Sequence, residues 1–309
     1  MTTARQPALV PLDQVVATAL AEDLGPGGDA RNDVTAMATI PPDAMATAAF
    51  VPRQDGRVAG LAAIVQTYAQ VDSQVKVFLQ AADGDRAVTG QAVAIINGPA
   101  RSVLAGERTA LNLLTHLCGI ATATALLVQA VGTHDCVVRD TRKTLPGLRA
   151  VEKAAVIAGG GANHRMSLVD ELLVKDNHVA AAGGMAQAVS AALAAADGLP
   201  VQIEVDSLDQ LDVVLAAGAT RVLLDNFSLA DTRQGVLACR SVDREVFVEA
   251  SGGITLDTVA DVAATGVDAV AVGALTHSSG ALDIGLDIRL HGSQPGIADV
   301  TTAEFGGQT

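Results

Sequence analysis

The residues best suited to chemistry form a basic cluster within an acidic chain. Between Arg101 and Lys175 there are nine Lys or Arg residues against six Asp or Glu, a net of +3, whereas the whole 309-residue chain carries −14. Arginine suits carboxylates and phosphates because its planar fork contacts two oxygens at once. Any one of these residues alone could be a surface charge or an ion-pair partner. Together they predict a site for a small ligand with several negative charges, and the cluster includes Arg108, Arg139, Arg142, Lys143, Arg165 and Lys175, with His164 among them.

Two carboxylates supply the opposite charge. Glu204 and Asp225 each stand at the end of a short apolar run, 21 residues apart. Paired carboxylates can bind Mg²⁺, accept hydrogen bonds from sugar hydroxyls, or stabilise a cationic transition state. They could also neutralise Lys143 and Lys175, and this reading does not exclude a functional role.

Two small loops offer backbone N–H groups for a phosphate. Ser251-Gly252-Gly253 and Gly273-Ala274 each follow an apolar run late in the chain. Loops at these positions in α/β barrels often form phosphate sites, although a simple turn would have the same composition.

Nucleophilic catalysis and dinucleotide binding have little support. The sequence has no GxSxG motif, and none of its cysteines has an activating context. Gly159-Gly160-Gly161 follows a helical stretch rather than a strand, so it is not a dinucleotide fingerprint.

The elements that would position these residues alternate between strands and helices. Six short apolar runs end at Arg139, Lys175, Glu204, Asp225, Glu249 and Gly273, and the last four of these are 21, 24 and 24 residues apart. Runs that are apolar throughout are typical of parallel strands buried on both faces. A repeated βα unit with chemistry at each carboxyl end predicts an open or incomplete α/β barrel of about six parallel strands. A doubly wound sheet is the competing architecture, with its ligand at one crevice.

The first hundred residues predict a separate α+β sandwich domain. Residues 47–51 and 58–61 flank the turn signal Gln54-Asp55-Gly56 and suggest a hairpin, and residues 75–79 alternate as a strand. A long helix over 101–130 should link the two domains. We expect an N-terminal domain over 1–118, to which 276–290 could return, a barrel over 119–275, and a polar extension over 291–309.

Composition narrows the class of protein. Half of the residues are hydrophobic, which is enough for a sizeable core, and only 2% are aromatic. A net charge of −14 argues against nucleic acid and anionic membranes as partners. The start lacks a signal peptide pattern, and no uninterrupted apolar stretch reaches the roughly 18 residues of a membrane span. Three widely spaced cysteines predict buried, reduced thiols, and we expect a cytoplasmic protein.

Several motifs together resemble one enzyme family, the quinolinate phosphoribosyltransferases, also called carboxylating nicotinate-nucleotide diphosphorylases. The resemblance covers roughly residues 15 to 290, and its most specific part is the pair formed by TRKT…PGLR and GGG-x-NHR. The matching stretches are Glu22–Asp29, Glu107–Asn112, Asp140–Arg149, Gly159–Arg165, Lys175–His178, Leu224–Phe227 and Glu249–Ile254.

This resemblance implies a reaction and a role for each matching residue. The family joins quinolinate to 5-phosphoribosyl-1-diphosphate with Mg²⁺ and releases nicotinate mononucleotide, diphosphate and CO₂, a step in making NAD. Lys143, Lys175, Glu204 and Asp225 would be catalytic. Quinolinate would be bound by Arg108, Thr141, Arg142, His164, Arg165 and Lys175. Phosphoribosyl diphosphate would be bound by Lys143, Lys175, Glu204, Asp225, Ser251, Gly252, Gly253, Gly273 and Ala274, with Mg²⁺ held by Glu204 and Asp225 directly or through the substrate.

The resemblance also implies a homodimer, because the residue matching Arg108 enters the neighbouring subunit's site. The nearest alternative is a related phosphoribosyltransferase, either nicotinate-using or associated with molybdate transport, but a monocarboxylate would not need so many cations. A non-catalytic phosphosugar-binding barrel and a Schiff-base aldolase using Lys175 are alternatives of other classes. The first would leave Glu204 and Asp225 without a purpose, and borohydride trapping on Lys175 would reveal the second.

Overall fold

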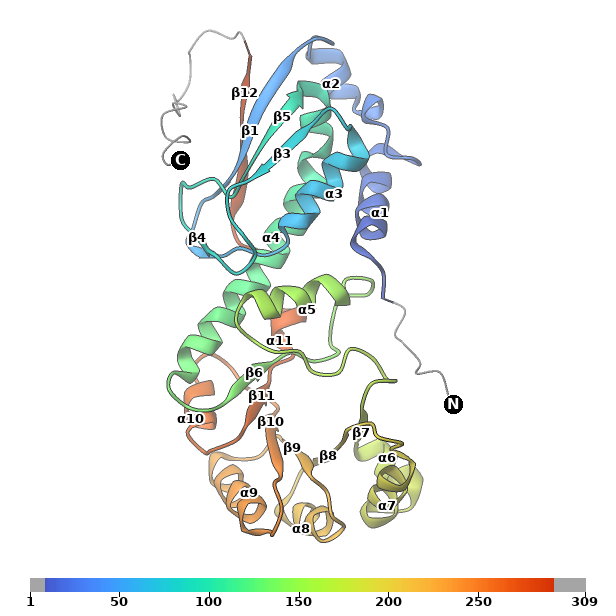
Figure 1. Cartoon of the computed structure of the whole chain (residues 1–309), viewed down its shortest axis with the longest axis vertical. Helices are drawn as coiled ribbons and strands as arrows, with labels where there is room; N and C mark the ends of the chain where they lie inside the picture. Colours follow the sequence, from blue (N-terminus) through green and yellow to red (C-terminus); the bar gives the residue numbers. More distant parts are fainter. Residues whose placement is uncertain (1–8, 292–309) are drawn as a thin grey trace.

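The computed structural model describes residues 9–291 and shows two domains stacked along the long axis of the molecule (Figure 1). The expected polar extension over 291–309 lies, apart from its first residue, outside the described residues.

The N-terminal domain is built on a four-stranded antiparallel sheet with helices on one face (Figure 1). Helix α3 packs on α4 and on the sheet, while α1 packs on α3. The strand order is β12-β1-β5-β3, so the last strand of the described residues returns to pair with the first. The sheet is made of β1 (Met45–Pro52), β3 (Lys76–Leu79), β5 (Ala94–Pro99) and β12 (Ile284–Leu290), and the helices are α1 (Leu12–Leu24), η1 (Ala30–Asn32), α2 (Val34–Thr39) and α3 (Leu61–Val71).

The predicted hairpin is wrong. Strand β1 pairs with β5 and β12, while the segment after the turn pairs as β2 (Gly56–Arg57) with β4 (Arg86–Ala87). Val58 and Ala59 are buried because the chain crosses α4 here, and the Ala59 N–H donates to the Cys118 thiol at 3.3 Å. Gly60 then has a φ of +86° and lies so close to Leu117 that a side chain would clash. Packing against a distant helix therefore overrides the local turn signal.

Helix α4 (Ala100–Val131) connects the domains, as predicted. It contributes Leu111 and Leu114 to the core of the N-terminal domain and Leu117 and Leu127 to the core of the barrel. The helix is long and apolar enough to cross a membrane, but more than half of its most apolar window is buried inside the protein. Burial within two cores accounts for its apolar composition.

The second domain contains the predicted six-stranded parallel sheet, in the order β6-β11-β10-β9-β8-β7. Consecutive strands β7 to β11 are neighbours, and β6 joins β11 at the far side, so the sheet has no switch point of the doubly wound kind. β6 and β7 are edge strands, which makes the barrel open. The strands are β6 (Val137–Arg139), β7 (Leu172–Val174), β8 (Val201–Val205), β9 (Arg221–Asp225), β10 (Phe247–Ser251) and β11 (Ala269–Ala271).

The helices of this domain occupy two positions (Figure 1). Those that follow β7 to β10 lie outside the sheet, and two others lie on the side facing the N-terminal domain. The outer helices are α6 (Asp176–Ala182), α7 (Met185–Ala195), α8 (Leu208–Ala216), α9 (Leu229–Ser241) and α10 (Val259–Ala263), and the others are α5 (Arg149–Ala158) and α11 (Ala274–His277).

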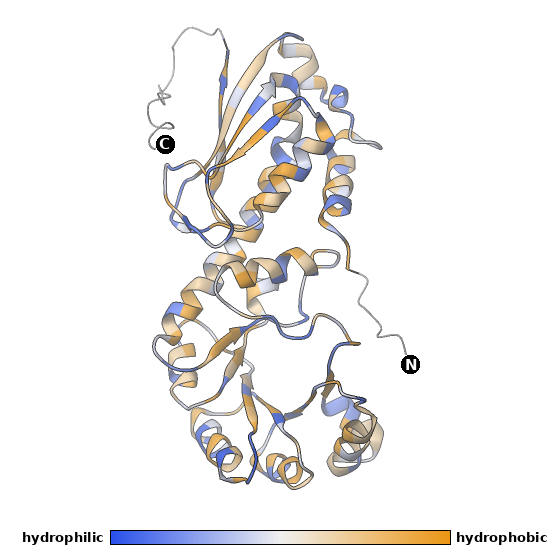
Figure 2. Cartoon of the chain, in the orientation of Figure 1, coloured by the Kyte–Doolittle hydropathy of each residue, from blue (hydrophilic) through white to orange (hydrophobic). Residues whose placement is uncertain are grey.

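The two faces of the barrel strands differ in polarity. Successive residues of a strand point to opposite faces. Val222, Leu224 and Val248 belong to the apolar core shared with the helices, and Figure 2 shows hydrophobic residues along the strands and on the helix faces turned toward them. The alternate positions carry Gln202 and Glu249, both fully buried. Barrels usually fill these inner positions with Val, Ile and Leu, so a polar interior needs a separate explanation.

Candidate active site

A pocket of about 370 Å³ opens at the carboxyl ends of the barrel strands. Strand ends and the loops that follow them supply its walls, which is where barrel active sites lie. Nine residues predicted from the sequence are among its lining, joined by three apolar side chains that form part of its wall. The lining consists of Thr141, Arg142, Lys143, His164, Arg165, Leu173, Lys175, Glu204, Leu223, Asp225, Ser251 and Ala271.

The loop after β6 brings Thr141, Arg142 and Lys143 to one wall. The Lys143 N–H donates to Thr141 Oγ1 at 3.0 Å, and the Thr276 hydroxyl of α11 donates to the Lys143 carbonyl at 2.8 Å. The Arg142 Nε is buried, and no hydrogen-bond partner is found for it within the described residues. A buried donor without a partner is costly, so this atom points to a missing acceptor such as a ligand carboxylate.

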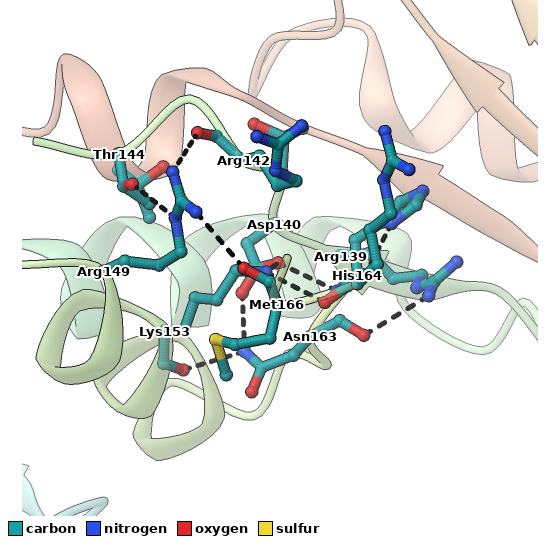
Figure 3. A network of polar contacts seen from close by, with 12 residues as sticks. Arg139, Asp140, Arg142, Thr144, Arg149, Lys153, Asn163, His164 and Met166 are labelled. Atoms are coloured by element: carbon teal, nitrogen blue, oxygen red, sulfur yellow. Dashed lines mark hydrogen bonds and ion pairs between the residues drawn. The ribbon is translucent and has the colours of Figure 1, made fainter. Parts of the chain in front are cut away.

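A buried ion pair holds the second wall (Figure 3). Asp140 and Lys153 are both fully buried and pair with each other. Asp140 also accepts from Asn163 Nδ2 at 2.5 Å and from the His164 N–H at 2.8 Å, while Lys153 Nζ donates to the His164 carbonyl at 2.9 Å. Burial raises the pKa of Asp140 and lowers that of Lys153, and their pairing opposes both shifts. The pair thus fastens the loop after β6, helix α5 and the segment carrying His164 to one another.

His164 is a neutral imidazole that lines the pocket next to this ion pair. It is 6% exposed, and its pKa is lowered to about 3, first by burial and then by Arg139 and other nearby cations. Its neighbour Arg165 has its pKa lowered by burial and by the charge of Arg142. The pocket therefore offers a neutral imidazole and the two neighbouring guanidinium groups of Arg142 and Arg165. A bound dianion would relieve the repulsion between these two positive charges.

The opposite wall carries the predicted carboxylates. Glu204 forms an ion pair with Lys175, and Asp225 accepts from Asn226 Nδ2 at 2.8 Å. In residues 9–291 no three His, Cys, Asp or Glu side chains cluster as a complete metal site. Two carboxylates fit a Mg²⁺ that arrives with substrate phosphates, because Mg²⁺ is commonly bound through one or two carboxylates plus phosphate oxygens.

The glycine loops lie beside this pocket rather than in its lining. Gly252 has a φ of +95° and sits against Asn226, and the backbone at Gly253 faces open space with a φ of +61°. A Cβ at Gly273 would lie 3.0 Å from Lys143 Cδ, so that loop adjoins the lysine. Ala274 begins α11 and is exposed.

Arg108 is the one predicted site residue that comes from the N-terminal domain rather than from the barrel. It lies on α4 in the N-terminal domain, is exposed, and is absent from the pocket lining.

Comparisons with known proteins place the chain in a family. The N-terminal domain model of quinolinate phosphoribosyl transferase matches residues 33–118, and the C-terminal domain model matches residues 120–287. The chain belongs to the quinolinate phosphoribosyltransferase family.

A relative and two solved structures illustrate the extent of the similarity to this family. The nicotinate-nucleotide pyrophosphorylase (carboxylating) of Mycobacterium leprae is 46% identical over 272 residues, 87% of this chain and 94% of the relative. The nicotinate-nucleotide pyrophosphorylase structure from Francisella tularensis has a TM-score of 0.83 at 34% identity, covering 93% of this chain and 100% of that one. Human nicotinic acid phosphoribosyltransferase, with a TM-score of 0.63 and 14% identity over 94% of this chain and 76% of that one, shares the fold alone.

Sequence reasoning gave no role to several residues of this quinolinate phosphoribosyltransferase-family chain that lie behind the pocket. It was also wrong to end a strand at Glu249, because β10 continues to Ser251 and Glu249 is buried in the middle of the strand. Gln202 and Glu249 are polar residues inside apolar strands, a pattern that does signal an inward polar position. Asp140 and Lys153 gave no such signal, because a fully buried lysine on a helix looks like a surface residue in sequence. Thr276 could be found only through its contact with Lys143.

Proposed function

We propose that this chain transfers phosphoribosyl from 5-phosphoribosyl-1-diphosphate to quinolinate with loss of CO₂, yielding nicotinate mononucleotide and diphosphate for NAD synthesis. The observation that carries the proposal is a single pocket lined by Arg142, His164 and Arg165 together with Glu204 and Asp225. Cations suit a dicarboxylate, and carboxylates suit a reacting sugar. The carboxylating names of full-length relatives at 38–46% identity support the same substrate.

Quinolinate would occupy the cationic wall, with Thr141, Arg142, His164, Arg165 and Lys175 as its ligands. Arg142 Nε and His164 Nε2 support this placement, since both are buried nitrogens without a hydrogen-bond partner among the described residues. We further propose that Arg108 completes the site of a partner subunit in a homodimer. Its exposure on α4 and its absence from the pocket of its own chain support that assembly.

Phosphoribosyl diphosphate would lie across the acidic wall. Lys143 and Lys175 would contact its diphosphate, and Glu204 and Asp225 its ribose and the accompanying Mg²⁺, which would neutralise phosphate charge. The 5′-phosphate would be bound by backbone groups of Ser251, Gly252, Gly253, Gly273 and Ala274. We also propose a cytoplasmic location, which the free thiols of Cys118, Cys136 and Cys239 support, although Cys136 is only half-buried.

The reaction requires the chain to orient two substrates and to balance charge. As the bond from C1 to the diphosphate oxygen breaks, C1 gains positive charge that Glu204 and Asp225 stabilise. The pyridine nitrogen donates its lone pair to C1 and becomes cationic. The bond between the ring and the 2-carboxylate then breaks, CO₂ leaves, and the electron pair on ring carbon 2 takes up a proton. Fixing both carboxylates aims the nitrogen at C1, so orientation supplies much of the rate enhancement.

The deciding experiment mixes the protein, Mg²⁺ and phosphoribosyl diphosphate with either quinolinate or nicotinate, and measures mononucleotide and CO₂. We expect mononucleotide and equimolar CO₂ from quinolinate only. Product from nicotinate alone would establish the nicotinate-using alternative instead, and no product from either would favour the non-catalytic barrel.

A second experiment tests the role of Lys143. We expect Lys143→Ala to release quinolinate mononucleotide that has not lost CO₂, if Lys143 assists decarboxylation. An unchanged ratio of CO₂ to mononucleotide would show that Lys143 acts only in binding the diphosphate.

A further inference from the structure

A buried carboxylate lies beneath the pocket and belongs to none of the roles described above. Glu249 is fully buried on β10, two residues before the pocket residue Ser251. Its Oε2 accepts from Arg139 Nη1 at 3.0 Å and from Gln202 Nε2 at 2.7 Å. Its Oε1 is buried with no hydrogen-bond partner among the described residues. Burying such a charge is unfavourable, so apolar side chains of similar volume would stabilise the barrel at least as well.

Arg139 links this carboxylate to the segment that carries His164. Arg139 Nη1 pairs with Glu249, while Nη2 donates to the Asn163 carbonyl at 3.3 Å (Figure 3). The backbone of Arg139 also forms a parallel bridge with Ala162. Glu249 thus fixes one guanidinium group that supports the chain directly before His164.

The position of the proton on His164 follows from a second contact. The Arg165 N–H donates to His164 Nδ1 at 2.6 Å, so the neutral ring carries its proton on Nε2. Nε2 lies 3.6 Å from Glu249 Oε2, which is beyond hydrogen-bond distance. The N–H is buried and without a partner in the described chain, while the ring lines the pocket.

Charged groups from several elements surround this ring. The cations are Arg139 of β6, Lys153 of α5, Arg221 of β9, and Arg165, which follows His164 in the chain. The anions are Glu171, 3.6 Å from Nδ1, and Glu249 on the Nε2 side. Burial and then the cations keep the ring neutral. Glu171 and Glu249 face the two ring nitrogens at the same distance, so the Arg165 N–H bond to Nδ1 decides between the tautomers, and the negative charge of Glu249 stabilises the proton that is left on Nε2.

We propose that Glu249 is a positioning residue that keeps His164 as a neutral Nε2–H donor for one carboxylate of the substrate. This inference rests on the proposed function, since it assigns the hydrogen bond to the dicarboxylate. Glu249 acts on the ring directly through its charge and on the backbone through Arg139. A neutral donor beside Arg142 and Arg165 adds direction to carboxylate binding without adding further repulsion between cations.

The Glu249→Gln variant tests this inference, because its amide preserves shape, removes the charge, and can itself donate to Nε2. We expect the KM for quinolinate to rise at least tenfold and the KM for phosphoribosyl diphosphate to change less than twofold. In the substrate-free protein, nitrogen NMR of the His164 ring should show the Nε2–H form in wild type and its loss in the variant. An unchanged quinolinate KM, or an unchanged ring spectrum, would overturn the proposal.

Two further variants separate positioning from simple stability. Asp268→Asn is the matched control, because Asp268 accepts from the Val248 N–H near the amino end of β10, away from the pocket. It should lower the melting temperature and leave both KM values unchanged, so an equal rise of quinolinate KM in this control would contradict the inference. Arg139→Lys retains the charge that faces Glu249 but cannot also reach the Asn163 carbonyl, and it should raise the quinolinate KM selectively even if Glu249→Gln folds poorly.

The ring spectrum is recorded without turnover, so it distinguishes failure of the proposed function from failure of the positioning role of Glu249. If wild type does not use quinolinate but shows the Nε2–H form that Glu249→Gln loses, the proposed function fails while the positioning of His164 stands. If quinolinate is used and the ring is unaffected by the variant, only the positioning fails.

Discussion

The core of the N-terminal domain and the inner side of the barrel sheet are filled in opposite ways. The N-terminal domain encloses Phe50, Ile64, Ile96 and Leu114, and its buried Tyr68 donates to a backbone carbonyl at 2.9 Å. The inner side of the barrel encloses arginines, carboxylates and a glutamine, whose contacts hold pocket residues in place. Apolar burial stabilises at about 25 cal/mol per Å², whereas buried ion pairs add little net stability. The first interior thus contributes stability, and the second contributes geometry.

The largest effect should come from removing one partner of a buried ion pair. Lys153→Met leaves Asp140 buried without its counterion, and we expect a loss of about 3–5 kcal/mol in unfolding free energy. Denaturant unfolding would measure it, together with a raised quinolinate KM.

The double variant Asp140→Asn with Lys153→Met sharpens the comparison. Removing both charges should recover most of the stability but not the KM, because Asp140 also holds Asn163 and His164. Full recovery of both quantities would show that the pair is structural only.

A cavity in the apolar core of the N-terminal domain should lower stability but leave activity nearly unchanged. Leu114→Ala in the N-terminal core should lower stability by about 3 kcal/mol, because Leu114 is fully buried. The kcat/KM of the folded enzyme should remain within about twofold of wild type. A large fall in kcat/KM, measured well below the melting temperature, would show that the apolar core of the N-terminal domain also sets the geometry of the pocket, and would contradict the comparison.

Acid should destabilise the polar interior through His164. Its folded pKa of about 3 lies below the usual value of 6.5, so as pH falls the unfolded chain takes up the proton first. The stability linked to this residue is complete above pH 6.5 and decreases from there toward pH 3, by about 2 kcal/mol at pH 5. Between pH 7 and pH 5, the fall in unfolding free energy should be about 2 kcal/mol smaller for His164→Gln than for wild type. Parallel losses in the two proteins would mean that His164 protonates freely in the folded state.

The smallest effect concerns the loop beside Lys143. In Gly273→Ala the new methyl group lies 3.0 Å from Lys143 Cδ, so the flexible lysine must shift. We expect binding of phosphoribosyl diphosphate to weaken by about 1 kcal/mol, which corresponds to a roughly fivefold higher KM for this substrate. Gly280→Ala is the control, since nothing lies within 4 Å of its added Cβ. Equal effects of the two variants would remove Gly273 from the phosphate loop.

Periodicity predicted the barrel because each parallel strand is an isolated apolar run with a polar end. Glu204 and Asp225 could be recognised in this way, since the strand itself delivers them to the pocket. Arg142 and Lys143 needed the resemblance to a family, because a loop residue has no periodic signal. The hairpin failed because β1 has partners 50 and about 240 residues away, and turn residues report only on local structure.

The contacts behind the pocket were beyond reach for a different reason. Lys153 and Asp140 are 13 residues apart, and nothing in their spacing says that a lysine on α5 turns inward. Gln202 and Glu249 interrupt apolar runs, so the sequence does mark them as unusual, but not which partners they bind. Such pairings depend on the packing of several strands at once.

The return of β12 to the first domain has a consequence for biosynthesis. Strand β1 can pair with β5 as soon as residue 99 has left the ribosome, but its other edge waits for residues 284–290. During that interval the whole barrel is translated while an apolar strand edge stays open, and open edges are sites of intermolecular pairing. Nascent chains stalled before residue 284 should therefore engage chaperones more than chains released after residue 290, so the last strand sets the moment at which the first domain becomes safe from aggregation.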